Sequence, residues 1–146
     1  MTPPVDSPAG SPDSKSAGFL RHAPDPMRYG HQNPSPDECD GLALAMIPRG
    51  ARVLDVGCGI GDFSARVRDS LGASVVGVEL DGQRAAQARD RGLIIHEQDL
   101  AEIPTATFGP FDVILYMDVL EHLSDPAAQL RAARRFLAPG GCIIAS

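Results

Sequence analysis

Residues 53–63 have the sequence Val-Leu-Asp-Val-Gly-Cys-Gly-Ile-Gly-Asp-Phe, so an apolar run leads directly into glycines at positions 57, 59 and 61. The apolar run predicts a buried strand, and the residues after the glycines predict a helix over Asp62–Leu71. A ligand can lie against the bare backbone of such a turn, where the helix supplies free N–H groups and the positive end of its dipole. This combination indicates a nucleotide-type cofactor site at the carboxyl end of a parallel sheet.

The spacing of the glycines narrows the class of cofactor. A dinucleotide-binding turn has the order Gly-x-Gly-x-x-Gly and places a pyrophosphate on the helix N-terminus. The third glycine of that order would fall at Asp62, whose carboxylate would repel a pyrophosphate. No Gly-Lys-Ser/Thr follows, which excludes a phosphate-binding P-loop. The order Asp55-x-Gly57-x-Gly59-x-Gly61 favours a ligand without phosphates, and an ordinary tight turn is the alternative.

Three further apolar runs each end in an acidic residue. The acids are Glu79, Asp99 and Asp118, in the runs 74–80, 93–100 and 111–118. Glu79 follows the glycines by about 20 residues, the separation typical of ribose recognition. A carboxylate there can accept hydrogen bonds from both ribose hydroxyls. Each acid taken alone is equally consistent with a helix cap or a solvated loop residue.

These motifs, in this order, resemble those of the class I S-adenosylmethionine-dependent methyltransferases. The resemblance covers residues 38–146 and rests on the segments 53–64, 79–80, 99–100, 111–123 and 130–146. It implies S-adenosylmethionine as the cofactor. It also implies a set of cofactor-binding residues: Asp55, Gly57, Cys58, Gly59, Gly61, Glu79, Leu80, Asp99, Leu100, Met117 and Asp118. The sequence Asp-Val-Leu-Glu-His-Leu at 118–123 resembles the small-molecule branch that includes quinone-biosynthesis enzymes, but it does not specify the substrate.

Alternating strands and helices predict an α/β fold, a Rossmann-like doubly wound parallel sheet with right-handed crossovers. We expect the strand order 3-2-1-4-5, with the cofactor at the switch between strands 1 and 4. The predicted helices are Asp37–Ile47, Asp62–Leu71, Asp81–Arg91 and Asp125–Leu137. Apolar residues of the first helix are expected to pack on the sheet, namely Leu42, Leu44, Met46 and Ile47.

The two ends of the chain differ from this core. Residues 1–36 hold eight of the thirteen prolines, so we predict a disordered segment there and a cofactor-binding core over 37–146. Phe19-Leu20 and Met27–Tyr29 are exceptions that could instead fold over the cofactor, as the segment before the first strand does in the resembling family.

The fifth strand is predicted over Cys142–Ser146, where the sequence stops. Complete members of the resembling family add two more strands and at least one helix, which include much of the acceptor pocket. We therefore expect a core that lacks the last two strands, either as a fragment or as a short protein that needs a partner. The open edge of the fifth strand would favour self-association or a partner chain.

Composition excludes several classes of function. The net charge of −6 leaves no basic footprint for nucleic acid. Three widely spaced cysteines, Cys39, Cys58 and Cys142, do not indicate a disulfide framework or a metal cluster. No apolar run is long enough to span a bilayer and no signal-peptide core is present, so we expect a cytoplasmic protein without a membrane span.

The chemistry implied by the resemblance is displacement of the sulfonium methyl by an oxygen or carbon nucleophile of a small-molecule acceptor. His122 follows the fourth strand and is the candidate general base, since an ordinary imidazole pKa of about 6.5 suits proton transfer. A structural role in the loop is the alternative. Asp118, Glu121 and His122 would share one face of a helical turn and could hold a divalent metal. A further ligand would still be required, so we predict no metal.

Two functions from different classes remain open at this point. The favoured one is a methyltransferase that acts on a small molecule, and the rival is a non-catalytic module that binds S-adenosylmethionine or a protein partner. A nicotinamide-dependent enzyme is disfavoured by the carboxylate of Asp62.

Overall fold

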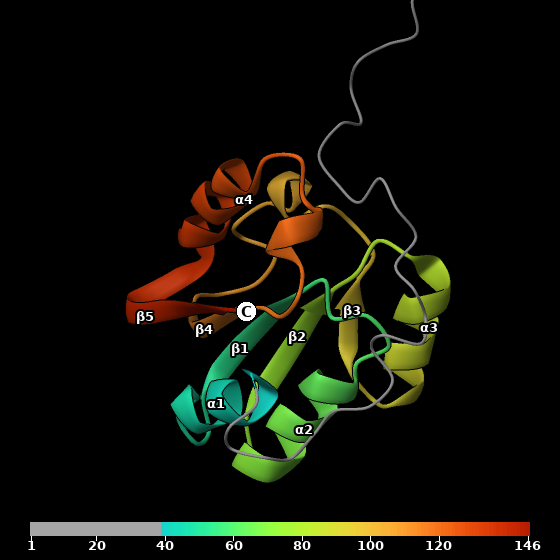
Figure 1. Ribbon diagram of the computed structural model, residues 1–146, viewed down its shortest axis with the longest axis vertical. Helices are drawn as coiled ribbons and strands as arrows, with labels where there is room; N and C mark the ends of the chain where they lie inside the picture. Colours follow the sequence, from blue (N-terminus) through green and yellow to red (C-terminus); the bar gives the residue numbers. More distant parts are fainter. Residues whose placement is uncertain (1–38) are drawn as a thin grey trace, which may run out of the picture.

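The computed structural model describes residues 39–146 (Figure 1). Its helices are α1 Cys39–Met46, α2 Asp62–Leu71, α3 Gly82–Asp90 and α4 Pro126–Ala133. Its strands are β1 Arg52–Val56, β2 Ser74–Val78, β3 Ile94–His96, β4 Phe111–Tyr116 and β5 Leu137–Ala145. Three 3₁₀ helices complete the core: η1 Leu100–Glu102, η2 Leu120–His122 and η3 Arg134–Phe136. The predicted disorder of residues 1–36, and the predicted cover by Phe19-Leu20 and Met27–Tyr29, lie outside the described residues.

The five strands form one parallel sheet in the order β3-β2-β1-β4-β5, which confirms the predicted α/β fold and strand order. β1 lies at the switch point between β2 and β4. Backbone bonds continue past the strand ends, where the Gly57 N–H donates to the Val78 carbonyl at 2.7 Å and the Glu79 N–H to the His96 carbonyl at 3.1 Å. The carboxyl ends of β1, β2 and β3 are thereby aligned at one edge of the sheet.

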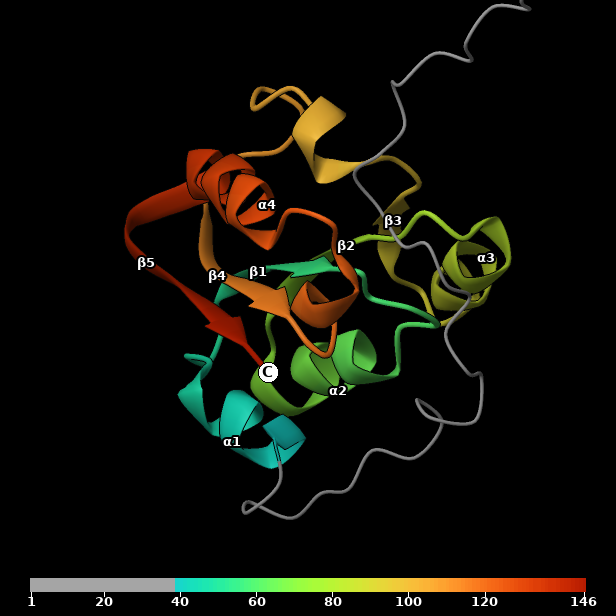
Figure 2. The same ribbon diagram turned by 45° about the horizontal axis from the view of Figure 1, so that its top comes forward.

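Helices cover both faces of the sheet (Figure 2). Alternate residues of β1 point to opposite faces. Val53 belongs to the apolar cluster that includes residues of α1, α2 and α3, and Leu54 to the cluster that includes residues of α4 and the 3₁₀ helices. Asp55 lies on the same face as Val53, toward α2, where its side chain contacts Ser64. The sheet therefore has an apolar core on each face. The predicted site residues lie at the carboxyl ends of the strands, next to both cores.

Local signals predicted most of the helix ends, but α4 ends at Ala133 and not at the predicted Leu137, because the 3₁₀ helix η3 follows it. α2 ends at Gly72, whose φ of 65° and whose N–H bond to the Arg68 carbonyl form a left-handed cap. The Asp81 carboxylate caps α3 by accepting the N–H groups of Gln83 and Arg84. Asp125 caps α4 in the same way, with Pro126 in the first turn.

The packing of the first helix agrees with the prediction only in part. Leu42 and Met46 are exposed, at 53% and 63% of their surface, whereas Ala43 and Ile47 enter the core. Leu44 packs against the same core, so two of the four predicted residues pack as expected and two do not. α1 has only eight residues, too few for a pattern of apolar residues to fix its rotation.

Two strand boundaries also differ from the predictions. β3 ends at His96, so Asp99 does not end the strand but caps the 3₁₀ helix η1. β5 begins at Leu137, five residues before the predicted start at Cys142, and its first part is irregular. Leu137 pairs with Phe111 and Cys142 pairs with Val113, which leaves a bulge around Gly140.

Gly61 is required by the packing of the protein itself. Its φ is 81°, and a Cβ there would lie 2.5 Å from Leu93 Cδ1 and 2.9 Å from Ala88 Cβ. The start of α2 therefore packs directly on α3 and on the residue before β3. Packing within the protein therefore explains why position 61 is a glycine, independently of any ligand.

We expect Gly61→Ala to lower the free energy of unfolding by about 3 kcal/mol, because a left-handed alanine is strained and its methyl group overpacks the contact with Ala88. The matched control is Gly72→Ala, which has a similar left-handed backbone but no neighbouring atom within 4 Å of the added Cβ. The control should lose about 1 kcal/mol. Urea unfolding measures both values, and equal losses would contradict the packing argument.

Candidate functional site

The three glycines of the turn after β1 have different surroundings. A Cβ on Gly57 would lie 2.7 Å from Val119 Cγ2, in the loop after β4, and Gly61 contacts Ala88 as described. Gly59 also has a left-handed backbone, with φ of 57°, but a Cβ there would meet no atom of residues 39–146 within 4 Å. Gly59 is therefore the one glycine of the three whose bare backbone faces open space.

Glu79 is the buried acid that holds this turn in place. Its side chain is only 2% exposed. Oε2 accepts the Gly59 N–H at 2.8 Å and Oε1 accepts the Asp81 N–H at 2.9 Å. The carboxylate thus connects the glycine turn to the start of α3. A carboxylate has about four acceptor positions, so capacity for further donors remains after these two bonds.

Asp55 lies in the protein interior, on β1, and it is also 2% exposed. Its Oδ2 accepts the Ser64 hydroxyl at 2.6 Å, which connects β1 to the first turns of α2. Burial raises the pKa of Asp55 to about 6, against the opposing effect of the Ser64 hydrogen bond, and the charge of Glu79 raises it further. Sequence reasoning missed Ser64, although its position near the start of α2 could have suggested it.

Three other predicted site residues have surroundings of their own. The Cys58 sulfur packs so closely on Gly77 of β2 that a Cβ at Gly77 would lie 2.6 Å from it. Burial raises the pKa of the Cys58 thiol, so it is a packing group and not a nucleophile. Leu100 is fully buried in the cluster that contains Leu54, and Met117 is partly buried against the other cluster, which contains Val53.

Asp99 lies in the segment after β3 and is partly exposed. Its Oδ1 accepts two hydrogen bonds, from the Ala101 N–H at 2.9 Å and from Gln129 Nε2 at 3.0 Å. Gln129 belongs to α4, on the other side of β4 in the sequence. Sequence reasoning missed this contact, because nothing in a single sequence pairs residues 30 positions apart.

Asp118 follows β4 in a strained conformation. Its φ of 52° is in the left-handed region, which a residue other than glycine seldom adopts. The Asp118 N–H donates to Ser146 Oγ at 2.9 Å, and the Ser146 hydroxyl donates to Asp118 Oδ1 at 3.2 Å. Such strain concentrates at functional sites, and here Ser146, which follows β5, helps to hold it.

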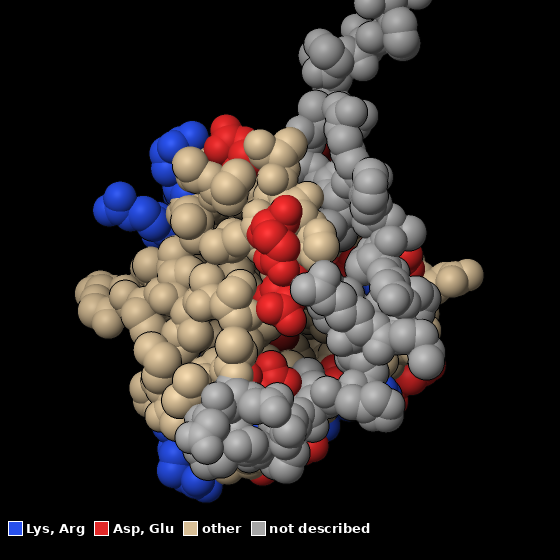
Figure 3. All heavy atoms as spheres, in the orientation of Figure 1, with Lys and Arg blue, Asp and Glu red and all other residues tan. Residues whose placement is uncertain are grey.

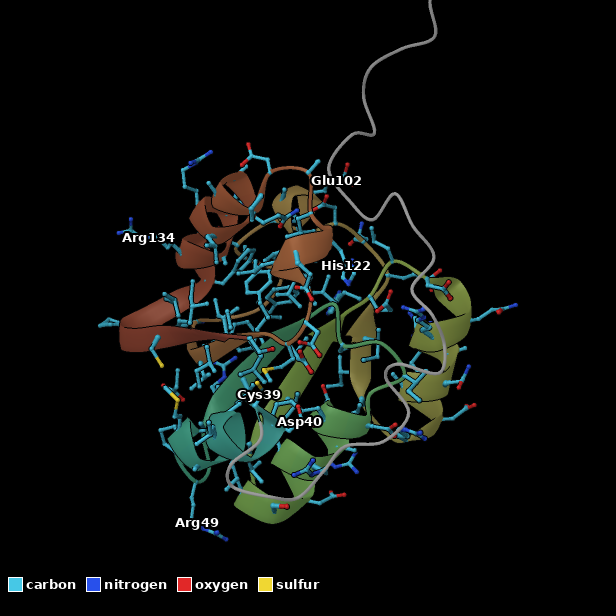
Figure 4. The ribbon with its side chains drawn as sticks, in the orientation of Figure 1. Cys39, Asp40, Arg49, Glu102, His122 and Arg134 are labelled. Atoms are coloured by element: carbon cyan, nitrogen blue, oxygen red, sulfur yellow. The ribbon has the colours of Figure 1, made fainter. Side chains whose placement is uncertain are left out.

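His122 ends the 3₁₀ helix η2, with Nε2 3.8 Å from Glu121 Oε1. Figure 4 shows it above the middle of the view, with Arg49, which precedes β1, at the bottom of the molecule. Asp118 lies before η2 with left-handed backbone, so the helical face considered for a metal is not formed. Within residues 39–146, no three His, Cys, Asp or Glu side chains are grouped closely enough to hold a metal ion.

The charge around this edge is predominantly negative. Figure 3 shows acidic side chains gathered in the middle of the face, with Lys and Arg side chains at its margin. The predicted site residues contribute four carboxyl groups, at Asp55, Glu79, Asp99 and Asp118. A site of this sign attracts a cationic ligand and repels a polyphosphate.

Comparison with known proteins identifies the family. A family of methyltransferase domains matches residues 29–146. The ubiquinone biosynthesis O-methyltransferase of Xanthomonas oryzae is 36% identical over 118 residues, which are 77% of this chain and 49% of that protein. The enzyme of the same name from Cereibacter sphaeroides is 41% identical over 103 residues, 67% of this chain and 41% of that protein. The chain thus spans about half the length of the curated relatives it matches.

Solved structures show the same arrangement. An S-adenosylmethionine-dependent methyltransferase from Mesorhizobium loti has a TM-score of 0.59 and 30% identity, over 73% of this chain and 52% of that chain. A methyltransferase from Geobacter sulfurreducens, solved in complex with S-adenosylhomocysteine, has a TM-score of 0.62 and 22% identity, over 77% of this chain and 49% of that chain. At this level of identity it supports the fold alone. The chain belongs to the class I S-adenosylmethionine-dependent methyltransferases. Membership of this family gives S-adenosylmethionine as the cofactor.

No helix between residues 39 and 146 combines the length and the apolar character that crossing a membrane requires.

We expect Asp55→Asn to change how stability depends on pH. The pKa of Asp55 rises from 3.8 to about 6 on folding, so the folded protein holds the proton more tightly than the unfolded chain. The contribution of the Asp55 carboxyl group to the free energy of unfolding is therefore fully present below pH 4, and it is lost as the pH rises to about 6. The loss is about 2–3 kcal/mol at pH 7, and the neutral variant does not suffer it.

Urea unfolding of the variant and of the wild type at pH 4 and pH 7 measures this effect. The free energy of unfolding of Asp55→Asn, relative to that of the wild type, should increase from pH 4 to pH 7. Asp69→Asn is the control of opposite sign, because the Arg68 guanidinium lowers the pKa of Asp69, which is exposed. A difference for Asp55→Asn that is independent of pH would contradict the burial argument.

Proposed function

We propose that this chain is the cofactor-binding part of an enzyme that transfers the methyl group of S-adenosylmethionine to an oxygen atom of a small molecule. The observation that carries the proposal is the bond between the buried Glu79 carboxylate and the Gly59 N–H, at the switch point of the sheet. The relatives named as ubiquinone biosynthesis O-methyltransferases support an oxygen over a carbon acceptor.

The residues at this edge fit the proposed cofactor. The backbone at Gly59, where a side chain would meet none of the described residues, would lie against the amino-acid part of the ligand. Glu79 would accept the ribose hydroxyls with its remaining lone pairs, and Asp99 would accept the adenine amino group. The acidic surroundings suit a ligand that carries a sulfonium and an ammonium group. Leu80 and Met117, which are partly buried, would supply the apolar contacts, whereas Leu100 is fully buried in the core.

The bound cofactor supplies a methyl group on a good leaving group, so the protein mainly has to align the acceptor and exclude water. A hydroxyl acceptor also has to lose its proton. We assign this step to His122, which lies after β4 in η2 and is partly exposed. Glu121 Oε1 lies 3.8 Å from its Nε2.

The acceptor, the partners and the location of the whole protein are part of the same proposal. In this family the acceptor pocket is built largely by the segment that follows the fifth strand, and β5 is the outermost strand here. One structural neighbour, from Haloferax volcanii, was solved in complex with the Trm112 methyltransferase activator. We propose that the free edge of β5 receives further strands or a partner chain, and that the protein works in the cytoplasm.

The alternative proposal is a module that binds S-adenosylmethionine without catalysis. This alternative is favoured by the length of the chain, which spans about half the length of its curated relatives. Incubation with tritium-labelled S-adenosylmethionine and catechol tests the two: transfer of label to catechol excludes the non-catalytic module.

We expect Glu79→Gln to weaken S-adenosylhomocysteine binding about 10-fold, because hydrogen bonds to a charged acceptor are stronger than those to an amide. The amide would also turn an NH₂ group toward one of the two backbone donors. Isothermal titration measures the affinity. Glu102→Gln is the control, since Glu102 is an exposed residue of η1. An unchanged affinity in a folded Glu79→Gln variant would contradict the ribose assignment.

His122→Ala should lower the rate of methyl transfer to catechol by about 100-fold or more, with little change in S-adenosylhomocysteine affinity. The pH dependence of the wild-type rate should be lost in the variant, because the titrating base is absent. Ser124→Ala, in the same loop, is the control. A variant that keeps the rate and the pH profile of the wild type would show that His122 has a structural role only.

A further inference from the structure

Gln129 is a buried polar residue that no step of the proposed chemistry uses. It lies in α4 and is 5% exposed. Its Nε2 donates to Asp99 Oδ1 at 3.0 Å, and its backbone carbonyl accepts the Tyr116 hydroxyl at 3.4 Å. One side chain thus connects the helix after β4 to the acid after β3, across the carboxyl edge of the sheet.

The other end of the same amide has no partner. Gln129 Oε1 is buried and accepts no hydrogen bond. Exchanging the amide nitrogen and oxygen would not relieve this, because the oxygen would then face the Asp99 carboxylate. An unpaired buried acceptor costs about 1–3 kcal/mol, which a leucine of similar size would avoid. Stability therefore does not explain the glutamine, whereas its bond to Asp99 does.

That bond restricts the orientation of the Asp99 carboxylate. Oδ1 holds two donors, the Ala101 N–H and Gln129 Nε2, which approach from η1 and from α4. Oδ2 accepts no hydrogen bond from the residues that the structure describes. With Oδ1 fixed from two directions, the carboxylate cannot rotate freely, and Oδ2 is left as its available acceptor.

We propose that Gln129 is a positioning residue that orients Asp99 so that Oδ2 accepts the amino group of the cofactor's adenine. This inference rests on the proposed function. It makes Gln129 a determinant of base specificity: a 6-oxo purine would turn a carbonyl oxygen toward a carboxylate that is held in place and cannot rotate away. Gln129 acts through Asp99 and makes no contact with the reacting atoms.

The test is Gln129→Leu, with S-adenosylhomocysteine and S-inosylhomocysteine as ligands in isothermal titration. We expect the affinity for S-adenosylhomocysteine to fall about 3- to 10-fold, as for the loss of one hydrogen bond, with the affinity for S-inosylhomocysteine unchanged. The thermal midpoint should be equal to that of the wild type or higher, because the unpaired Oε1 is removed. Gln129→Met is measured in parallel, so that a loss of affinity caused only by poor packing of the leucine side chain is recognised.

Coupling to Asp99 provides the second readout. In an Asp99→Ala background, Gln129→Leu should have no further effect on S-adenosylhomocysteine affinity. Equal losses for both ligands, an unchanged preference for adenine, or the same loss in the Asp99→Ala background would each overturn the inference. Failure of the proposed function is distinguishable, because the wild type itself would then not bind S-adenosylhomocysteine.

Discussion

The site depends on one buried hydrogen bond, between the Glu79 carboxylate and the Gly59 N–H. A charge with 2% exposure is unfavourable unless it is well hydrogen-bonded, and two backbone donors satisfy it here. The same bond fixes the glycine turn after β1 against the end of β2. The turn and the acid therefore form one unit: the acid that would bind the ligand also shapes the backbone on which the ligand would lie.

Close packing gives this unit its rigidity. Gly57 and Gly61 have no room for a side chain because Val119 and Ala88 contact them. Gly59, between them, is the position that the protein leaves open. A motif of three glycines thus divides into two that join structural elements and one that faces outward. The acidic groups below and beside the turn add a negative field, which agrees with a cationic cofactor and with the absence of a phosphate-binding motif.

The fold and the ordered motifs could be predicted from sequence because they follow local rules. Apolar runs, the capping acid Asp81 and the stop at Gly72 depend only on nearby residues. The rest depends on contacts between distant segments. The bulge near Gly140 reflects pairing with β4, and the rotation of α1 reflects the shape of the sheet beneath it. Gln129 and Asp99 are 30 positions apart, so their contact exists only once α4 is placed.

The pair formed by Asp118 and Ser146 links the outer strand to the centre of the site. Ser146 reaches Asp118 because its own N–H continues the pairing of β5 with the Tyr116 carbonyl. If Ser146 moves away, Asp118 loses the hydroxyl that holds its left-handed backbone. A displacement at the end of β5 is thereby converted into a change of geometry where the methyl group would be transferred.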